Sequence, residues 1–214
     1  LVHVRAGIEI SVAATKSYTA QLIAFYLIGI FLAEKKNSAP KEELMSLKKG
    51  LFDLSAQIEA ILNNQEDIKK CAKTYYNFRD FIFLARGVNF PVALEGALKL
   101  KEISYINATG YQAGEMKHGP IAMLDHEMPV LAITTPGITY KKIISNAQEA
   151  KSRDARMIAV TTENDSNVHD IFESVMTVPE VEELLSPVLN VIPLQLLAYY
   201  IAEFLGKDID QPRN

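Results

Sequence analysis

The segment FIFLARGVNFPVALEGALKLKEISYIN, residues 81–107, sets the fold class of this chain. Its first part, Phe81 to Ala85, is apolar on both faces, as in a fully buried strand. Gly87 follows at the carboxyl end of that strand, and the remainder has helical spacing. The alternation predicts an α/β fold, a parallel sheet flanked by helices on both faces. The further strands are predicted at Val130 to Thr134, Met157 to Thr161 and Val175 to Val178, and the helices at 91–107, 140–152 and 184–205.

The predicted helix at 91–107 carries a narrow stripe of charged residues. At about 100° per residue, Glu95, Lys99 and Glu102 fall on one face, and apolar residues flank them. Spacing alone supports two interpretations equally. The stripe is either a set of solvated ion pairs worth a few tenths of a kcal/mol each, or the lining of a polar cavity suited to proton transfer.

A loop soon after this helix favours the second interpretation. Lys117-His118-Gly119-Pro120 places a histidine beside two helix breakers, and a histidine on such a loop near a charged helix face is a candidate for catalysis. His3 and His169 have no obvious partners, and the acidic neighbours of His126 point in different directions. Because no spacing resembles a zinc site, we expect no metal and no cofactor.

The amino-acid composition excludes several classes of protein. With 214 residues, 49% hydrophobic and 22% charged, the chain can bury one or two cores and is too apolar to be disordered. A net charge of −4 and a pI near 5.6 argue against nucleic acid as a partner. The single cysteine, Cys71, excludes a disulfide framework and fits a reducing compartment, so we expect a cytoplasmic protein.

No membrane partner is expected either. The apolar run Leu22 to Ala33 is shorter than the roughly 20 residues that a bilayer requires, and a buried helix explains it better. The chain has no secretory leader and begins at Leu1 without a methionine, which indicates a piece of something longer.

An internal repeat does most to define the architecture. Six residues recur at one offset of 174 residues, as 183 minus 9 shows. Each copy is predicted to form a short strand, a polar turn with a glutamate and a long apolar helix, so the copies are interpreted as the ends of two related lobes. The pairs are Val4 and Val178, Glu9 and Glu183, Gln21 and Gln195, Leu22 and Leu196, Ala24 and Ala198, and Tyr26 and Tyr200.

The repeat predicts one complete lobe plus the tail of a preceding lobe. A whole α/β unit precedes the second copy and nothing precedes the first, so we expect that on the order of 100 residues are absent. From Lys35 to roughly Lys73 the leucine spacing predicts a connector helix, with Pro40 in its first turn. The predicted domains are the truncated first lobe (1–35), the connector (36–75) and the second lobe (76–214).

The carboxyl ends of the predicted strands are the expected place for a ligand. Thr134, Thr135 and Gly137 come before the helix at Tyr140, where helix-terminal N–H groups are able to cradle a phosphate. A plain strand-to-helix turn explains the same residues. Without a denser cluster of Ser, Thr and Gly, the plain turn is favoured.

Four motifs point to a family when they are taken in order. They are AGIEISVAATKSYTAQL at 6–22, ALEGALKLKEISYI at 93–106, YQAGEMKHGP at 111–120 and DQPRN at 210–214. Over essentially the whole chain they resemble the isomerase domain of the glucosamine-6-phosphate synthase family, the glutamine-dependent fructose-6-phosphate amidotransferases. The resemblance implies a two-lobed sugar isomerase fold and a homodimer. It also implies a reaction in which fructose 6-phosphate and ammonia from an N-terminal glutaminase domain give glucosamine 6-phosphate.

Matching motif positions carries the family's roles onto particular residues. The resemblance implies that Glu102 is the base that moves a proton between C1 and C2, that Lys99 assists at the open-chain oxygen, and that Glu95 orients its partners. It implies that His118, supplied by the neighbouring subunit, helps to open the sugar ring. Val12 and Ala14 resemble the sugar-contacting loop of the first lobe.

The sequence also departs from the family pattern. Ala14 stands where the family usually has serine, and the chain stops at Asn214, before the family's imine-forming lysine. The Ser/Thr-rich phosphate loops of the first lobe and the glutaminase are absent, so we expect no turnover by the chain alone. Two other functions stay open: a sugar-phosphate-sensing module, and a ketose-amine deglycase or deaminase.

Overall fold

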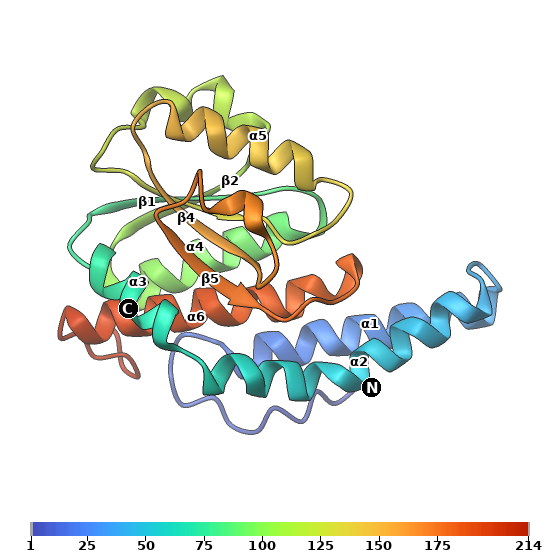
Figure 1. Cartoon of the computed structure of the whole chain (residues 1–214). Coiled ribbons are helices and arrows are strands. Elements are labelled where there is room, and N and C mark those ends of the chain that lie inside the picture. The colour runs from blue at the N-terminus through green and yellow to red at the C-terminus, as the bar shows by residue number, and fades with distance from the viewer. Residues whose placement is uncertain (1, 214) are drawn as a thin grey trace.

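The computed structural model describes residues 2–213, so Leu1 and the last residue of the DQPRN motif, Asn214, lie outside the described residues. Its centre is a five-stranded parallel sheet with the strand order β2-β1-β3-β4-β5 (Figure 1). The predicted parallel sheet is confirmed, and each of its expected strands lies within about one residue of the predicted bounds. The strands are β1 (Asp80–Ala85), β2 (Asn107–Gln112), β3 (Pro129–Ile133), β4 (Arg156–Thr162) and β5 (Ser174–Val178).

Helices cover both faces of the sheet, as predicted. Successive residues of β1 alternate between two cores, with Phe83 in one and Leu84 in the other. The first core lies under α3 (Glu66–Tyr75), α4 (Phe90–Ser104) and α6 (Ser186–Phe204). The second lies under α5 (Tyr140–Lys151) and the short 3-10 helices η2 (Glu115–His118) and η3 (Pro120–Met123). The remaining 3-10 helices are η1 (Gly87–Asn89), η4 (Ser166–Val168) and η5 (Glu183–Leu185).

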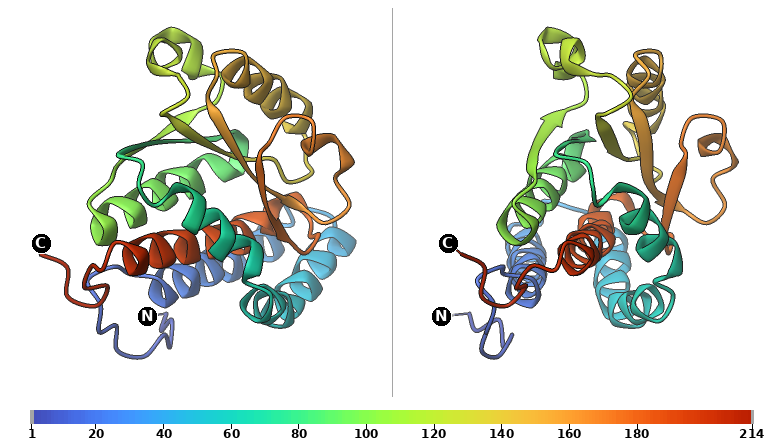
Figure 2. Two further views of the ribbon diagram at one scale, coloured as in Figure 1. Left: turned by 60° about the vertical axis from the view of Figure 1, so that its left-hand side comes forward. Right: turned by 90° about the vertical axis from the view of Figure 1, so that its left-hand side faces the viewer.

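A helical hairpin precedes this α/β unit. It consists of α1 (Lys16–Lys36) and α2 (Lys41–Asn63). Asn37 ends α1 in the left-handed conformation, with φ of 49°, and Pro40 comes immediately before α2. The two helices lie beside α6 beneath the sheet (Figure 2), and their joined ends project away from it (Figure 1).

Two elements differ from the sequence-based prediction. The strand β2 was not expected, because Asn107–Gln112 has no β-branched run, and this edge strand is defined by its pairing with β1. The expected connector helix is two helices, since α2 ends at Asn63 and α3 begins at Glu66. Gly110 allows β2 to lie close to α4, because a Cβ there would come within 3.1 Å of the Leu94 backbone.

The first copy of the repeat also differs from its prediction. Residues 2–15 contain neither helix nor strand, so the strand expected at Val4 is absent. A strand needs a neighbour to complete its hydrogen bonds, and no described strand lies next to this segment. The prediction of a strand here is therefore wrong for the described part of the chain.

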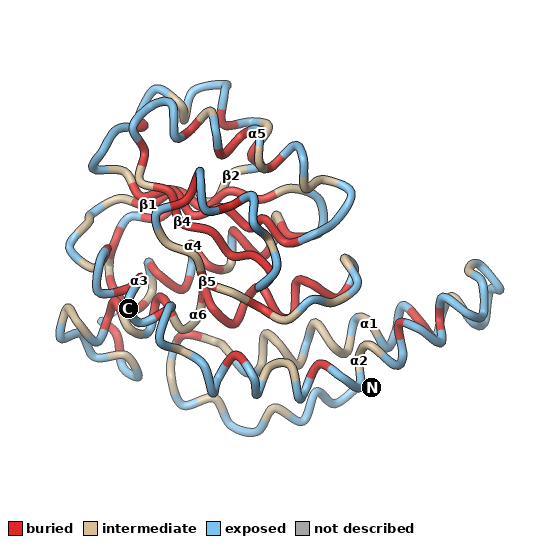
Figure 3. The backbone as a smooth tube through the Cα atoms, viewed as in Figure 1, coloured by how far each residue is buried: buried red, intermediate tan, exposed pale blue. Residues whose placement is uncertain are grey.

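The apolar run Leu22 to Ala33 lies in α1, which is longer and less buried than predicted. Ile30 is the one residue of α1 described as buried, and most of the helix is coloured as exposed or intermediate in Figure 3. The prediction of a buried helix is therefore wrong for this run. By length and composition alone, α1 and the stretch Glu183–Phe204 are both apolar enough to span a membrane, although 72% of the second is buried inside the protein.

Candidate active site

The charged stripe of α4 is a compact ion triad in which Lys99 is buried and both glutamates are half-buried. The Nζ atom of Lys99 lies 3.3 Å from Glu95 Oε1 and 2.7 Å from Glu102 Oε2. Lys99 is 3% exposed, and the side chains of Glu95 and Glu102 are 12% and 22% exposed. Of the two interpretations that spacing left open, the solvated face is therefore excluded. One amine therefore lies between two carboxyl groups on this face of α4.

The electrostatics of the triad follow from its burial. Desolvation raises the pKa of Glu95, and the charge of Glu102 adds to that rise, whereas the charge and the hydrogen bond of Lys99 oppose it. Tyr18, from α1, lies near the same carboxylate. Burial, with a contribution from Glu95, raises the pKa of Tyr18 to about 12, so its phenol stays neutral. The first residues of α1 thus belong to the surroundings of the triad.

Lys99 lines a cavity of about 170 Å³. Four separate parts of the chain form its wall: the turn before α1, the middle of α4, the middle of α6, and the C-terminal segment. Ser11 Oγ donates a hydrogen bond of 3.0 Å to the Ile209 carbonyl, which joins the first of these parts to the last. The lining residues are Ser11, Ala13, Thr15, Lys99, Ile103, Gln195, Tyr199, Ile209 and Asp210.

The predicted sugar-contacting residues lie on the turn that reaches this cavity. Val12 is 55% exposed, and neither Val12 nor Ala14 is among the lining residues, which are their neighbours Ser11, Ala13 and Thr15. Glu9 fixes the turn, because its carboxylate accepts hydrogen bonds from the backbone N–H groups of Thr15 and Ser17 at 3.1 and 3.2 Å. The turn therefore reaches the cavity, but through the neighbours of Val12 and Ala14, and the sugar contacts of these two residues stay a prediction.

The C-terminal segment is pinned near the same cavity. Beyond Ile209, the backbone N–H of Arg213 donates to Tyr105 Oη at 2.9 Å, and the Arg213 guanidinium lies 4.4 Å from the centre of the Tyr105 ring. Such a cation–π contact is worth about 0.5–1 kcal/mol at an exposed site. Tyr105 directly follows α4, so the described part of the DQPRN motif is held at the end of the helix that carries the triad.

His118 lies on the other side of the sheet. It is exposed at the end of η2, and Met116 of the same turn packs into the core beneath α5, whereas α4 belongs to the opposite core. The adjacent Lys117 forms an ion pair of 2.7 Å with Glu149 of α5. The sheet therefore separates this histidine from the triad of its own chain.

Sequence reasoning missed Gln195. Its Nε2 atom is buried and donates no hydrogen bond to any residue within 2–213, which costs about 1–3 kcal/mol for a buried amide. A signal was available, because Gln195 interrupts the apolar run Val191 to Leu197 of α6. We read it only as a member of the repeat, paired with Gln21.

The turn after β3 is occupied by the protein's own groups. Asn190 Nδ2 donates hydrogen bonds of 2.9 Å to Thr135 Oγ1 and to Asn89 Oδ1. The Glu183 carboxylate accepts the N–H of Ile138 at 2.9 Å and fills the space where a Cβ on Gly137 would lie. A carboxylate already at this turn agrees with the plain strand-to-helix turn.

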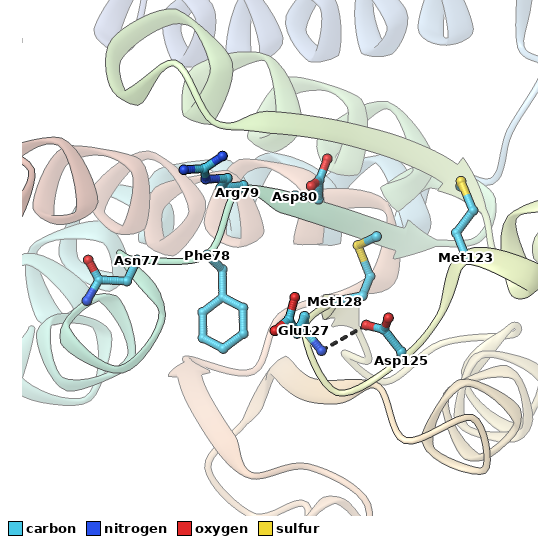
Figure 4. Close-up of a pocket in the computed structure, with 8 residues that line it drawn as sticks. All are labelled: Asn77, Phe78, Arg79, Asp80, Met123, Asp125, Glu127 and Met128. Carbon is cyan, nitrogen blue, oxygen red and sulfur yellow. Dashed lines mark hydrogen bonds between the residues drawn. The ribbon is translucent and has the colours of Figure 1, made fainter.

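A second hollow of about 430 Å³ lies at the opposite edge of the sheet, where β1 and β3 begin. Figure 4 shows Asp80, Asp125 and Glu127 around it, together with the hydrogen bond from the Glu127 N–H to Asp125. Ligands of open parallel sheets bind beyond the carboxyl ends of the strands. Because this hollow is at the amino ends, we do not assign it a functional role.

These observations define a parallel α/β domain with a buried charged helix face beside a small cavity. The SIS domain family matches residues 75–202, and the chain belongs to that family. The family match covers the whole sheet, together with α4, α5 and most of α6.

Individual relatives narrow the assignment within this family. The chain is 56% identical over its full length to the isomerizing glutamine–fructose-6-phosphate aminotransferase of Gloeobacter violaceus, and 46% identical to that of Thermus thermophilus. It spans about 35% of the length of these curated relatives. The resemblance inferred from the four motifs is thereby confirmed.

Solved structures agree with this assignment. The C-terminal domain of glucosamine-fructose-6-phosphate aminotransferase from Francisella tularensis matches with a TM-score of 0.90 at 36% identity, over 97% of this chain and 58% of that one. A tagatose-6-phosphate ketose/aldose isomerase from Escherichia coli matches with a TM-score of 0.76 at 20% identity, over 96% of this chain and 54% of the other. The second likeness shows the fold alone.

Proposed function

We propose that the chain is the isomerase part of a longer polypeptide that converts fructose 6-phosphate and glutamine-derived ammonia to glucosamine 6-phosphate. The observation that carries the proposal is the ion pair of buried Lys99 and half-buried Glu102, 2.7 Å apart, on a helix whose Lys99 lines a cavity. The full-length similarity to isomerizing aminotransferases supports it. In this proposal residues 1–35 close a first lobe, 36–75 connect, and 76–214 form the second lobe.

The reaction requires a proton to move between adjacent carbons. Ammonia condenses with the C2 carbonyl of the open-chain ketose and water leaves, which gives an imine. Glu102 then removes a proton from C1 and the same carboxyl returns it to C2, while the C1 hydroxyl loses its proton and the imine nitrogen gains one, so that an aldehyde forms at C1 and an amine forms at C2. Lys99 stabilises the negative charge that develops on the C1 oxygen, and Glu95 orients Lys99. The turn that carries Val12 and Ala14 borders the sugar in this proposal, because the neighbouring residues of the same turn line the cavity.

Ring opening is assigned to a second copy of the chain. His118 lies on the opposite side of the sheet from the triad, which supports its supply by the other subunit of a homodimer. The apolar outer face of α1 is assigned to protein contacts and not to lipid, because its repeat counterpart α6 packs within a core. The acidic net charge supports no nucleic-acid partner.

The proposed cellular compartment rests on the state of the single cysteine. Cys71 is free and buried, and burial raises its pKa to about 12 against a weaker, lowering hydrogen bond with Ser174. It is therefore an unreactive thiol with no disulfide role. We assign the protein to the cytoplasm on this basis.

The proposal is tested with Glu102→Gln in the intact polypeptide. Loss of the base is expected to lower kcat by about 10²- to 10⁴-fold, while the affinity for fructose 6-phosphate stays within a few-fold, because the amide keeps the shape of the carboxylate. Lys101→Gln is the matched control, since Lys101 is exposed on the same helix. Turnover of Glu102→Gln at the rate of the control would refute the role of Glu102.

A mixing experiment tests the shared site. Glu102→Gln and His118→Ala are each expected to be inactive as homodimers. In a random mixture half of the dimers are mixed, and each of these has one site with both native groups, so about a quarter of the activity should return. No recovery after subunit exchange would place His118 in the site of its own chain.

A further inference from the structure

The cavity beside Lys99 contains one polar side chain for which the fold gives no reason. Gln195 lies in the middle of α6, across the cavity from α4. Its neighbours from Val191 to Leu197 are otherwise apolar, and Leu194 and Leu197 are each 1% exposed. A leucine or methionine would therefore suit the packing of α6 at position 195 as well as glutamine does.

A comparison within α6 sharpens the point. Asn190 is also buried, and its Nδ2 holds the loops after β1 and β3 together through Asn89 and Thr135. That amide has a structural task. Gln195 is half-buried as a residue, but its Nε2 atom is withdrawn from solvent and meets no acceptor among the described residues. A buried donor without a partner calls for an explanation.

The cavity supplies the explanation. Gln195 and Lys99 line the same space of about 170 Å³, so a ligand held there would lie against a side-chain amide and an ammonium. An apolar ligand would leave the amide unpaired, and an amine would meet two donors. An oxygen atom of a ligand would accept a hydrogen bond from the amide and from the ammonium.

We infer that Gln195 contacts the ligand, and that its Nε2–H donates a hydrogen bond to a hydroxyl or carbonyl oxygen of the open-chain phosphosugar held beside Lys99. This inference rests on the proposed function and deepens it. Gln195 selects for an oxygen at this end of the ligand and takes no part in proton transfer.

The test compares Gln195→Met with Gln21→Met in the intact polypeptide. Gln21 is the repeat counterpart of Gln195 and is exposed on α1. Calorimetric titration with fructose 6-phosphate should give a Kd about tenfold higher for Gln195→Met, as expected for one lost hydrogen bond, and an unchanged Kd for Gln21→Met. The thermal midpoint of Gln195→Met should be equal to or above that of the parent, because an unpaired polar group has been removed.

A second measurement requires no substitution. The side-chain NH₂ resonances of Gln195, assigned by ¹⁵N labelling, should shift downfield when fructose 6-phosphate is added. Unchanged resonances, or an unchanged Kd for a folded Gln195→Met, would overturn the inference and leave the proposed function intact.

The outcomes separate the two proposals. If the intact protein binds fructose 6-phosphate through Gln195 but does not convert it, the proposed reaction fails and the ligand contact stands. If the intact protein does not bind the phosphosugar at all, both proposals are overturned. If it converts the sugar and Gln195→Met is indistinguishable from the parent, the ligand contact alone falls.

Discussion

Helices α1 and α6 are repeat counterparts, yet their surroundings are opposite. Leu27 and Ile201 occupy matching positions at the offset of 174 residues; Leu27 is 54% exposed, and Ile201 is fully buried. α6 is enclosed by α2, α3, α4 and the sheet, whereas α1 contacts only α2 and α6 extensively. Whether an apolar helix is buried therefore depends on the elements that pack around it. The sequence of the helix itself does not specify those elements.

The largest expected effect tests this difference directly. Ile201→Ala removes a fully buried side chain and should lower the free energy of unfolding by about 2–5 kcal/mol. Leu27→Ala, at the matching position of α1, should change it by less than about 0.5 kcal/mol. Urea unfolding followed by circular dichroism measures both. Equal losses for the two variants would mean that α1 is buried in solution.

The next effect on stability comes from two polar residues at matching positions, Asn190 in α6 and Lys16 in α1. Asn190→Leu removes the donor shared by Asn89 and Thr135. It leaves Thr135 Oγ1 without this donor and Asn89 Oδ1 with only the 3.4 Å bond from Ser186 Oγ, which should cost about 1–3 kcal/mol. At the matching position, Lys16 Nζ donates to the Ile8 carbonyl on the surface, and Lys16→Leu should cost less than about 0.5 kcal/mol. The comparison fails if unfolding midpoints of the two variants coincide.

Two glycine-to-alanine substitutions are expected to change the free energy of unfolding in opposite directions. A Cβ on Gly29 of α1 would meet no atom within 4 Å, whereas a Cβ on Gly96 of α4 would lie 2.6 Å from Leu194 Cδ1 and 3.1 Å from Phe83 Cε1. Gly29→Ala should stabilise by about 0.5–1 kcal/mol through helix propensity. Gly96→Ala should destabilise by about 1 kcal/mol, because overpacking exceeds that gain. Thermal midpoints that both rise would show that α4 and α6 adjust without strain.

The smallest effect concerns the glutamates before the two helices. Desolvation is the largest single influence and acts to raise the pKa of Glu9, but the hydrogen bonds from Ser17 and Thr15 and the charge of Lys16 together outweigh it and lower the pKa. The stability that this carboxylate gives to the start of α1 is therefore present above its ordinary pKa and is lost as the pH falls through the lowered value. Amide NMR of Thr15 and Ser17 should report this step.

The control for the pH step is Glu9→Gln. This variant should abolish the pH-dependent shift at Thr15 and Ser17 while the amide of Ile138, which is bound by the repeat counterpart Glu183, behaves as in the parent. A step that persists in the variant would assign it to another group.

Local geometry explains what the sequence predicted well. Apolar runs of four or five residues predicted β1, β3, β4 and β5. The first three are central strands, whose two faces are both covered. The charged stripe was predicted because residues three and four apart on a helix are neighbours wherever that helix packs. That local geometry brings Lys99 to Glu95 and Glu102.

What the sequence did not predict depends on distant partners. β2 exists because β1 offers it a free edge, and the exposure of α1 depends on what lies beside it. The cavity brings together residues near positions 11, 99, 195 and 210, so its wall has no local pattern. The one sequence signal for Gln195 was that it is a polar residue in an otherwise apolar stretch of helix.

The clasp between Arg213 and Tyr105 has a practical consequence. It fixes the C-terminal segment against the end of α4, only a few residues after Ile209 and Asp210 have contributed to the cavity wall. Whatever follows this segment, whether further residues of the intact polypeptide or a fused purification tag, would begin a few residues from the cavity wall. Activity assays should therefore use protein tagged elsewhere, or cleaved before measurement.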